Sequence, residues 1–140
     1  MDWGVHVHAT VGAFQWNRLS DCAVEYYVGL DQRHDEISGV LADLSAENFG
    51  RDGPPSIGDT IEMRMPLWGQ SEMTVLMIVD VGATHFPSLV LPEFHVNFRK
   101  LIPLFARELD FKKSEGYEVL IDRFEKAGTE YWCCGRAPAI

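Results

Sequence analysis

Two histidines near the N-terminus are the residues in this chain best suited to chemistry. His6 and His8 are separated by one residue, in a run rich in β-branched and aromatic side chains that predicts a strand over residues 5–14. Side chains two positions apart on a strand point to the same face, so both imidazoles could hold one metal ion. A third ligand would have to come from elsewhere in the chain; otherwise the two are ordinary strand histidines. We predict no metal site and no cofactor.

The stretch around His8 also resembles a catalytic motif. Residues 7–11 read VHATV, which is similar to the motif of the 2H phosphoesterase family: an apolar residue, His, any residue, Thr or Ser, and a second apolar residue. That family carries the motif on two central strands, so the resemblance implies one histidine as general base, the other as general acid, and hydroxyls that hold the phosphoryl oxygens. Residues 94–98 would be the second copy, with Asn97 in place of the hydroxyl residue. The implied catalytic residues of a phosphodiester or cyclic-nucleotide hydrolase are His8, Thr10, His95 and Asn97.

Acidic residues suggest a different function. The formal net charge is −9. Residues 1–60 carry ten acidic residues against three arginines, and residues 61–140 carry eleven acidic against nine basic residues, so most of the excess lies in the first half. Such a surface has little with which to displace phosphate counterions, so we expect no direct nucleic-acid binding. A basic protein partner fits this charge, although acidity can also serve solubility alone.

The predicted docking face lies on and just before one helix. Residues 35–47 carry apolar side chains at the i, i+3, i+4, i+7 spacing of an amphipathic helix. The acidic residues lie between and around these apolar positions, where they would face solvent or a partner. The residues that we expect to contact a basic partner are Asp31, Asp35, Glu36, Asp43 and Glu47.

The remaining chemistry-bearing residues point to the compartment rather than to a reaction. The three cysteines, Cys22, Cys133 and Cys134, form an odd number, which fits a reducing environment better than a disulfide framework. The sequence begins without the basic and apolar regions of a secretory signal, and no apolar run approaches the roughly 20 residues of a membrane span. We therefore expect a cytoplasmic protein with no membrane association.

Alternating patterns and breakers predict the elements that hold these residues. Further strands are expected over residues 22–30, 60–68, 72–82, up to 98, and 129–134, with helices over 35–47, 103–110 and 115–127. In the last helix, Ser114 would be the N-cap and Gly128 the left-handed C-cap. This order predicts an α+β fold, a mostly antiparallel sheet with two to three helices packed on it, in a single domain of residues 1–140.

Composition is ordinary for a globular domain, with 46% apolar and 24% charged residues. Two function classes therefore stay open. The first is a small acidic binding or inhibitor protein, of the immunity or phage anti-defence type, that docks its acidic face on a partner. The second is the 2H-like phosphoesterase with His8 and His95. Whether the chain is an enzyme stays undecided at this point, and the binding protein is our main prediction.

Overall fold

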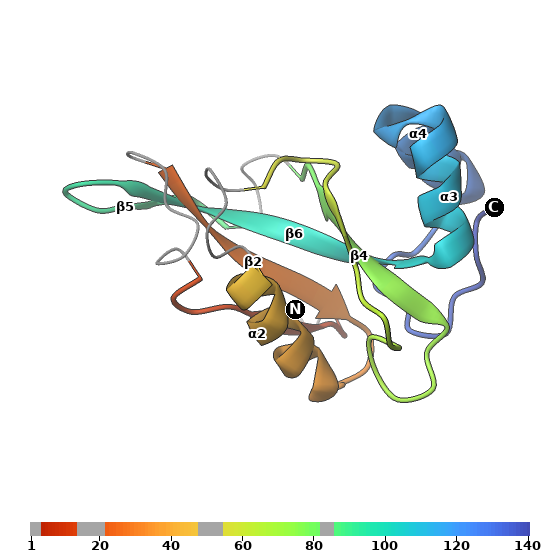
Figure 1. Cartoon of the computed structure of the whole chain (residues 1–140), viewed down its shortest axis with the longest axis horizontal. Coiled ribbons are helices and arrows are strands. Elements are labelled where there is room, and N and C mark those ends of the chain that lie inside the picture. The colour runs from red at the N-terminus through yellow and green to blue at the C-terminus, as the bar shows by residue number, and fades with distance from the viewer. Residues whose placement is uncertain (1–3, 14–21, 48–54, 82–85) are drawn as a thin grey trace.

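The computed structural model describes residues 4–13, 22–47, 55–81 and 86–140, and a mixed β-sheet runs through it (Figure 1). Its strand order among these residues is β1-β2-β6-β4-β3, and β5 pairs with the start of β6. Only β2 and β6 run parallel; the other pairs are antiparallel. This confirms the predicted α+β class. The strands are β1 His6–Ala9, β2 Cys22–Leu30, β3 Thr60–Glu62, β4 Met73–Val79, β5 Leu89–Val90 and β6 His95–Phe105.

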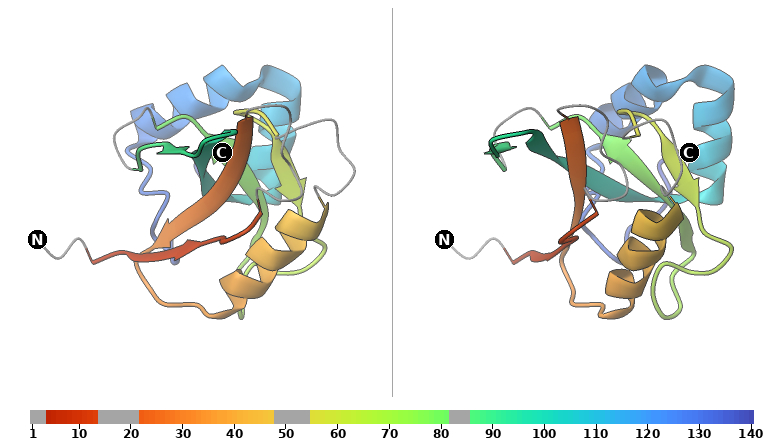
Figure 2. Two further views of the ribbon diagram at one scale, coloured as in Figure 1. Left: turned by 90° about the vertical axis from the view of Figure 1, so that its left-hand side faces the viewer. Right: turned by 60° about the vertical axis from the view of Figure 1, so that its left-hand side comes forward.

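Helices cover both faces of the sheet, as Figure 2 shows. Helix α2 (Glu36–Glu47) lies on one face, and α3 (Ala106–Glu115) and α4 (Tyr117–Ala127) lie on the other. Side chains on β4 alternate between the two cores: Leu76 and Ile78 pack with α2, whereas Val75, Met77 and Val79 pack with α3 and α4. Burial on both faces explains why β4 is apolar at successive positions.

Strand β1 is shorter than predicted because the chain turns after Ala9. A buried carboxylate causes the turn: Glu25 of β2 accepts hydrogen bonds from the Gly12 amide (2.7 Å), the Ala13 amide (3.3 Å) and the Thr10 hydroxyl. Gly12 has φ +100°, a region that favours glycine. The predicted strand over residues 5–14 is therefore wrong beyond Ala9, and Phe14 lies outside the described residues.

The helix predicted over 103–110 exists but begins later than expected, because Pro103 lies inside β6 opposite Leu76 of β4. Proline has no backbone N–H to donate to a neighbouring strand, so it is tolerated where one side of its strand is unpaired. Here β2 pairs with β6 only as far as Leu101, opposite Val28, so Pro103 follows the last pair on that side. The helix begins three residues later, at Ala106.

The C-terminal region contains less strand than predicted. Two helices, α3 and α4, meet at Gly116, and Ser114 does not cap α4; its hydroxyl donates to the Phe111 carbonyl. Gly128 is the left-handed C-cap that the sequence predicted, with φ 61°. Residues 129–134 form turns instead of a strand, and the Asp31 amide bonds the Trp132 carbonyl at 2.8 Å. This segment therefore packs beside the sheet without extending it.

Two smaller differences affect the site. Strand β3 ends at Glu62 rather than at residue 68, and Trp68 is buried with the α2 core. No helix in residues 4–13, 22–47, 55–81 or 86–140 combines the length and apolar character that crossing a membrane requires.

Candidate partner-binding surface

The predicted acidic face is present on α2. Glu36 and Asp43 are seven residues apart, so they share one side of the helix, and both are exposed. Ile37, Val40 and Leu44 turn inward to the core. Glu47 is the last residue of α2, and its side chain lies outside the described part of the structure. The helix contains no lysine or arginine, so its outer side has no basic residue to balance it.

Asp35 lies just before α2 and has a partner of its own. Its carboxylate bonds Arg33 Nε at 2.8 Å, and both side chains are about three-quarters exposed, at 75% and 72%. The Arg33 guanidinium beside it lowers the pKa of Asp35 below its usual range. An exposed pair of this kind contributes little to stability and can rearrange when a partner binds.

Asp31 is half-exposed and also bonds the C-terminal segment. Its carboxylate accepts a hydrogen bond from the Cys134 amide at 2.8 Å and so fastens the C-terminal segment to the end of β2. Burial acts to raise the pKa of Asp31, but the hydrogen bonds from Cys134 and Cys133 outweigh it and lower that pKa. Burial, together with Asp31, raises the pKa of the Cys134 thiol to about 12. Asp31 thus lies apart from the face that Glu36 and Asp43 form.

The residues of the phosphoesterase interpretation are not brought together. His8 lies opposite Val28 of β2, and His95 lies opposite Cys22. These β2 positions are six residues apart, which at about 3.3 Å per residue places the two histidines roughly 20 Å apart. General acid–base cooperation on one phosphate needs both within hydrogen-bond reach. The geometry therefore contradicts a paired site.

The two hydrogen-bonding residues of that interpretation are also engaged elsewhere. The Thr10 hydroxyl donates to Glu25, and the same oxygen accepts from the Tyr26 amide at 2.8 Å. The Asn97 side chain accepts from the Ser88 hydroxyl at 2.6 Å and donates to the Cys22 sulfur at 3.5 Å. Both residues stabilise local packing.

A corner of histidines lies where β1 meets the start of α2. His34 stacks on buried Trp68 with ring centroids 5.1 Å apart, and the Nε2 atoms of His8 and His34 are buried with no hydrogen-bond partner among the described residues. Burial is the main cause that lowers the pKa of His8, against the opposing charge of Asp35. Within the described residues, no three His, Cys, Asp or Glu side chains are grouped to hold a metal ion. The lowered pKa of His8 favours its neutral imidazole form.

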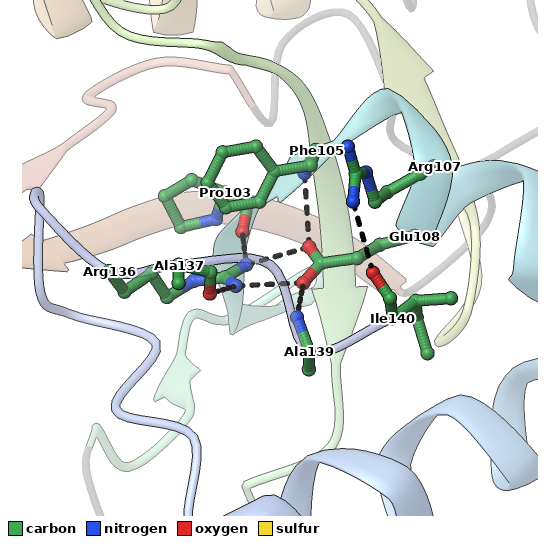
Figure 3. Close-up of polar contacts among 8 residues, drawn as sticks. All are labelled: Pro103, Phe105, Arg107, Glu108, Arg136, Ala137, Ala139 and Ile140. Carbon is green, nitrogen blue, oxygen red and sulfur yellow. Dashed lines mark hydrogen bonds and ion pairs between the residues drawn. The ribbon is translucent and has the colours of Figure 1, made fainter.

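The opposite face of the molecule is closed by a buried ion pair (Figure 3). Arg136 and Glu108 meet through two N–O contacts of 2.8 Å, and only 5% and 0% of their side chains are exposed. Glu108 also accepts the amides of Phe105 (3.0 Å) and Ala139 (2.9 Å), and Arg136 donates to the Pro103 carbonyl (2.9 Å). This clamp, Glu108 with Arg136, holds the C-terminal segment against the junction of β6 and α3.

Both buried glutamates escaped our sequence analysis. Glu25 interrupts a run of buried β2 residues, Val24 and Tyr26 among them, and an acid in such a run is a signal for an internal anchor. Glu108 lies three residues after Phe105, where a helix N-cap would be, and Glu at that position commonly bonds the N-cap amide. Neither signal identifies the groups that the glutamate bonds, because those groups lie in other segments of the chain.

A family model for Suppressor of fused protein (SUFU) matches residues 17–137. The chain belongs to the SUFU family. No match is found among curated proteins. A putative SUFU homologue from Neisseria gonorrhoeae superposes with a TM-score of 0.78 at 22% identity, over 96% of this chain and 70% of that one.

Two other solved structures share the fold at lower identity. A chain of the Sufu-Fu complex gives a TM-score of 0.69 at 12% identity, over 96% of this chain and 76% of that one. Drosophila Suppressor of Fused gives 0.66 at 13% identity, over 83% of this chain. The match spans only 32% of the Drosophila protein. These likenesses establish the SUFU fold for this chain.

Proposed function

We propose that this chain is a protein-binding module of inhibitory type that docks the acidic face of α2 on a basic surface of a partner protein. The observation that carries the proposal is the exposed pair Glu36 and Asp43 on a helix without a basic residue. By contrast, α3 carries three acidic and three basic residues. Complementary charge speeds association and selects among partners.

The family supports protein binding as the use of this fold, since a chain of similar fold was crystallised in a Sufu-Fu complex. An acidic face that covers a basic functional surface would inhibit the partner, as immunity and phage anti-defence proteins do. The three free thiols, Cys22, Cys133 and Cys134, support a reducing compartment, so we place the protein in the cytoplasm as part of the same proposal.

The test is affinity purification from source cells with the wild-type chain and two charge-reversed variants. The first variant is Asp35→Lys/Glu36→Lys/Asp43→Lys. The matched control reverses three exposed acids around α4, Glu115→Lys/Glu118→Lys/Glu125→Lys, and so changes the net charge equally. We expect a stoichiometric partner whose affinity falls at least about tenfold, or 1.4 kcal/mol, for the α2 variant and much less for the control.

Salt dependence provides a second readout. Binding by the wild type should weaken from low to high ionic strength, because exposed charges are screened beyond a Debye length of roughly 8 Å at physiological salt. The α2 variant should lose most of this dependence. Equal loss of binding in the two variants would show that only net charge matters, and the docking face would then be wrong.

A further inference from the structure

The three cysteines of this chain have different chemical neighbours. In the C-terminal segment, the thiols of Cys133 and Cys134 both hydrogen-bond the Asp31 carboxylate. Burial and this carboxylate together raise the pKa of the Cys134 thiol to about 12, because a nearby negative charge opposes loss of the thiol proton. Cys22, half-buried at the start of β2, is bonded instead by an amide. The three thiols should therefore differ in reactivity.

A histidine and an asparagine lie beside Cys22 on the neighbouring strand. Strands β2 and β6 run parallel here, and His95 is the register partner of Cys22. Paired residues of neighbouring strands lie about 4.8 Å apart, and their side chains point to the same face. Asn97, two positions further along β6, shares that face and donates from Nδ2 to the Cys22 sulfur at 3.5 Å. The thiol thus lies next to an imidazole and is held by an amide.

These two neighbours can supply what a reactive thiol needs. The Asn97 side chain is oriented by the Ser88 hydroxyl, which donates to its Oδ1 at 2.6 Å and leaves its Nδ2 directed at the sulfur. An N–H donor at the sulfur stabilises the charged thiolate more than the neutral thiol. The His95 imidazole is exposed, and within the described ranges it has no hydrogen-bond or ion-pair partner. It is therefore free to turn toward Cys22 and take the thiol proton.

The face around Cys22 favours an anionic reagent. Its side chains along the two paired strands contain no acid and one base; they are Cys22, Val24, Tyr26 and Val28 on β2, and His95, Asn97, Arg99 and Leu101 on β6. In the described part of the chain Arg99 has no ion-pair partner, and its Nε is buried without a hydrogen bond. A small disulfide that carries carboxylates can bring one of them toward Arg99 while its sulfur meets Cys22.

We propose that Cys22 is a site of S-thiolation, where its thiol exchanges with a small anionic disulfide and His95 acts as the base. His95 takes the thiol proton, and the thiolate attacks one sulfur of the disulfide RSSR. A bond forms between the Cys22 sulfur and that sulfur while the disulfide bond breaks. The leaving thiolate takes the proton from His95, so the products are a mixed disulfide of Cys22 with RS and the thiol RSH. This modification goes beyond the proposed protein binding and does not depend on it.

The probe is dithiobis-nitrobenzoate (DTNB), an anionic disulfide that releases a coloured thiolate as each cysteine reacts. Mass spectrometry of the digested protein locates the modified residue, and thermal melting confirms that every variant is folded. In the folded wild type, we expect Cys22 to react at least about tenfold faster than Cys133 and Cys134, because only Cys22 has a base beside it. Cys22→Ser should lose the fast phase. If Cys22 reacts no faster than the other two thiols, the site is overturned.

The role of His95 is tested by His95→Gln, which keeps a polar side chain but removes the base. The rate at Cys22 should fall at least about threefold at pH 7 and should then rise close to tenfold from pH 6 to pH 7, as for an isolated thiol. The wild-type rate should rise less steeply over the same interval, because His95 has already taken part of the thiol proton. A purely structural role of His95 would leave this slope unchanged. An unchanged rate and slope would overturn His95 as the base.

The preference for an anion is tested by Arg99→Gln against the matched control Arg64→Gln, which removes an exposed charge outside this face. Arg99→Gln should slow DTNB at Cys22 at least about twofold more than the control does, because it removes the cation that pairs with the carboxylate. The neutral reagent hydroxyethyl disulfide should react equally with both variants. Equal slowing of DTNB by the two variants would overturn the anionic preference.

Discussion

The two faces of the sheet are each organised by a buried glutamate, but the two residues serve different ends. Glu108, under α3 and α4, shares its charge with Arg136 and fastens the last residues of the chain. Glu25, near β1 and α2, bonds the Gly12 and Ala13 amides and shapes a loop at the surface. Glu108 thus holds the C-terminal segment in place, whereas Glu25 fixes residues 10–13, which line a groove beside α2.

The exposed charges follow the same division. Helices α3 and α4 each carry both acidic and basic residues, and Lys126 pairs with Asp122 at 2.6 Å within α4. On α2 the charges are all acidic, and neither Glu36 nor Asp43 has an ion-pair partner in the described part of the chain. The comparison shows that α3 and α4 mix acidic and basic residues, whereas α2 carries acidic residues alone.

The largest expected effect tests the closed side. Arg136→Met should lower the free energy of unfolding by about 3–5 kcal/mol, because it leaves the Glu108 carboxylate buried without its counter-charge. Chemical denaturation measures the change. Lys126→Met is the matched control, since it removes an exposed pair worth about 0.3–0.5 kcal/mol. If the two variants cost the same, the clamp does not stabilise the fold as described.

A smaller effect is expected on the open side. Glu25→Gln should cost about 1–3 kcal/mol, because an amide cannot accept from the Gly12 and Ala13 amides and the Thr10 hydroxyl as a carboxylate does. Amide exchange at Gly12 and Ala13 should quicken more than exchange in α4. Glu62→Gln, on the exposed acid of β3, should change neither quantity. Unchanged exchange at Gly12 would show that Glu25 does not hold residues 10–13.

The smallest effect concerns pH at the histidine corner. Because burial lowers the pKa of His8 below its usual value of 6.5, the unfolded chain binds its proton more readily than the folded one. The resulting stability is present above pH 6.5 and is lost as pH falls from there toward the folded pKa. Urea unfolding at pH 5.5 and 7.5 should therefore show a smaller pH difference for His8→Gln than for the wild type. An identical difference would show that His8 does not contribute to the pH dependence of stability.

Much of the fold could be predicted from local pattern. The period-2 run of β2, the apolar β4 and the helical spacing of α2 each depend on burial that the sequence records directly. The start of α3 was predicted too early, because the place of Pro103 in β6 depends on where the neighbouring strand β2 stops pairing. Residues 129–134 were predicted as a strand for a similar reason. Asp31 and the clamp hold them in place without the hydrogen bonds of a neighbouring strand.

Only part of the candidate surface could be predicted from the sequence. Glu36 and Asp43 could be predicted because exposed acids on an amphipathic helix follow from its spacing alone. The bond between Asp31 and the Cys134 amide could not be predicted, since it joins residues 103 positions apart. The pairing of His8 with His95 required a strand register that no motif carries. The groove likewise depends on Glu25 reaching back to residues 10–13.

Hydrogen–deuterium exchange on the purified complex with the captured partner tests the central claim most directly. Exchange is compared, peptide by peptide, between the free chain and the complex. Our account predicts protection of α2, with α3 and α4 unchanged. Protection confined to α3 and α4, with α2 exchanging as in the free chain, would contradict it.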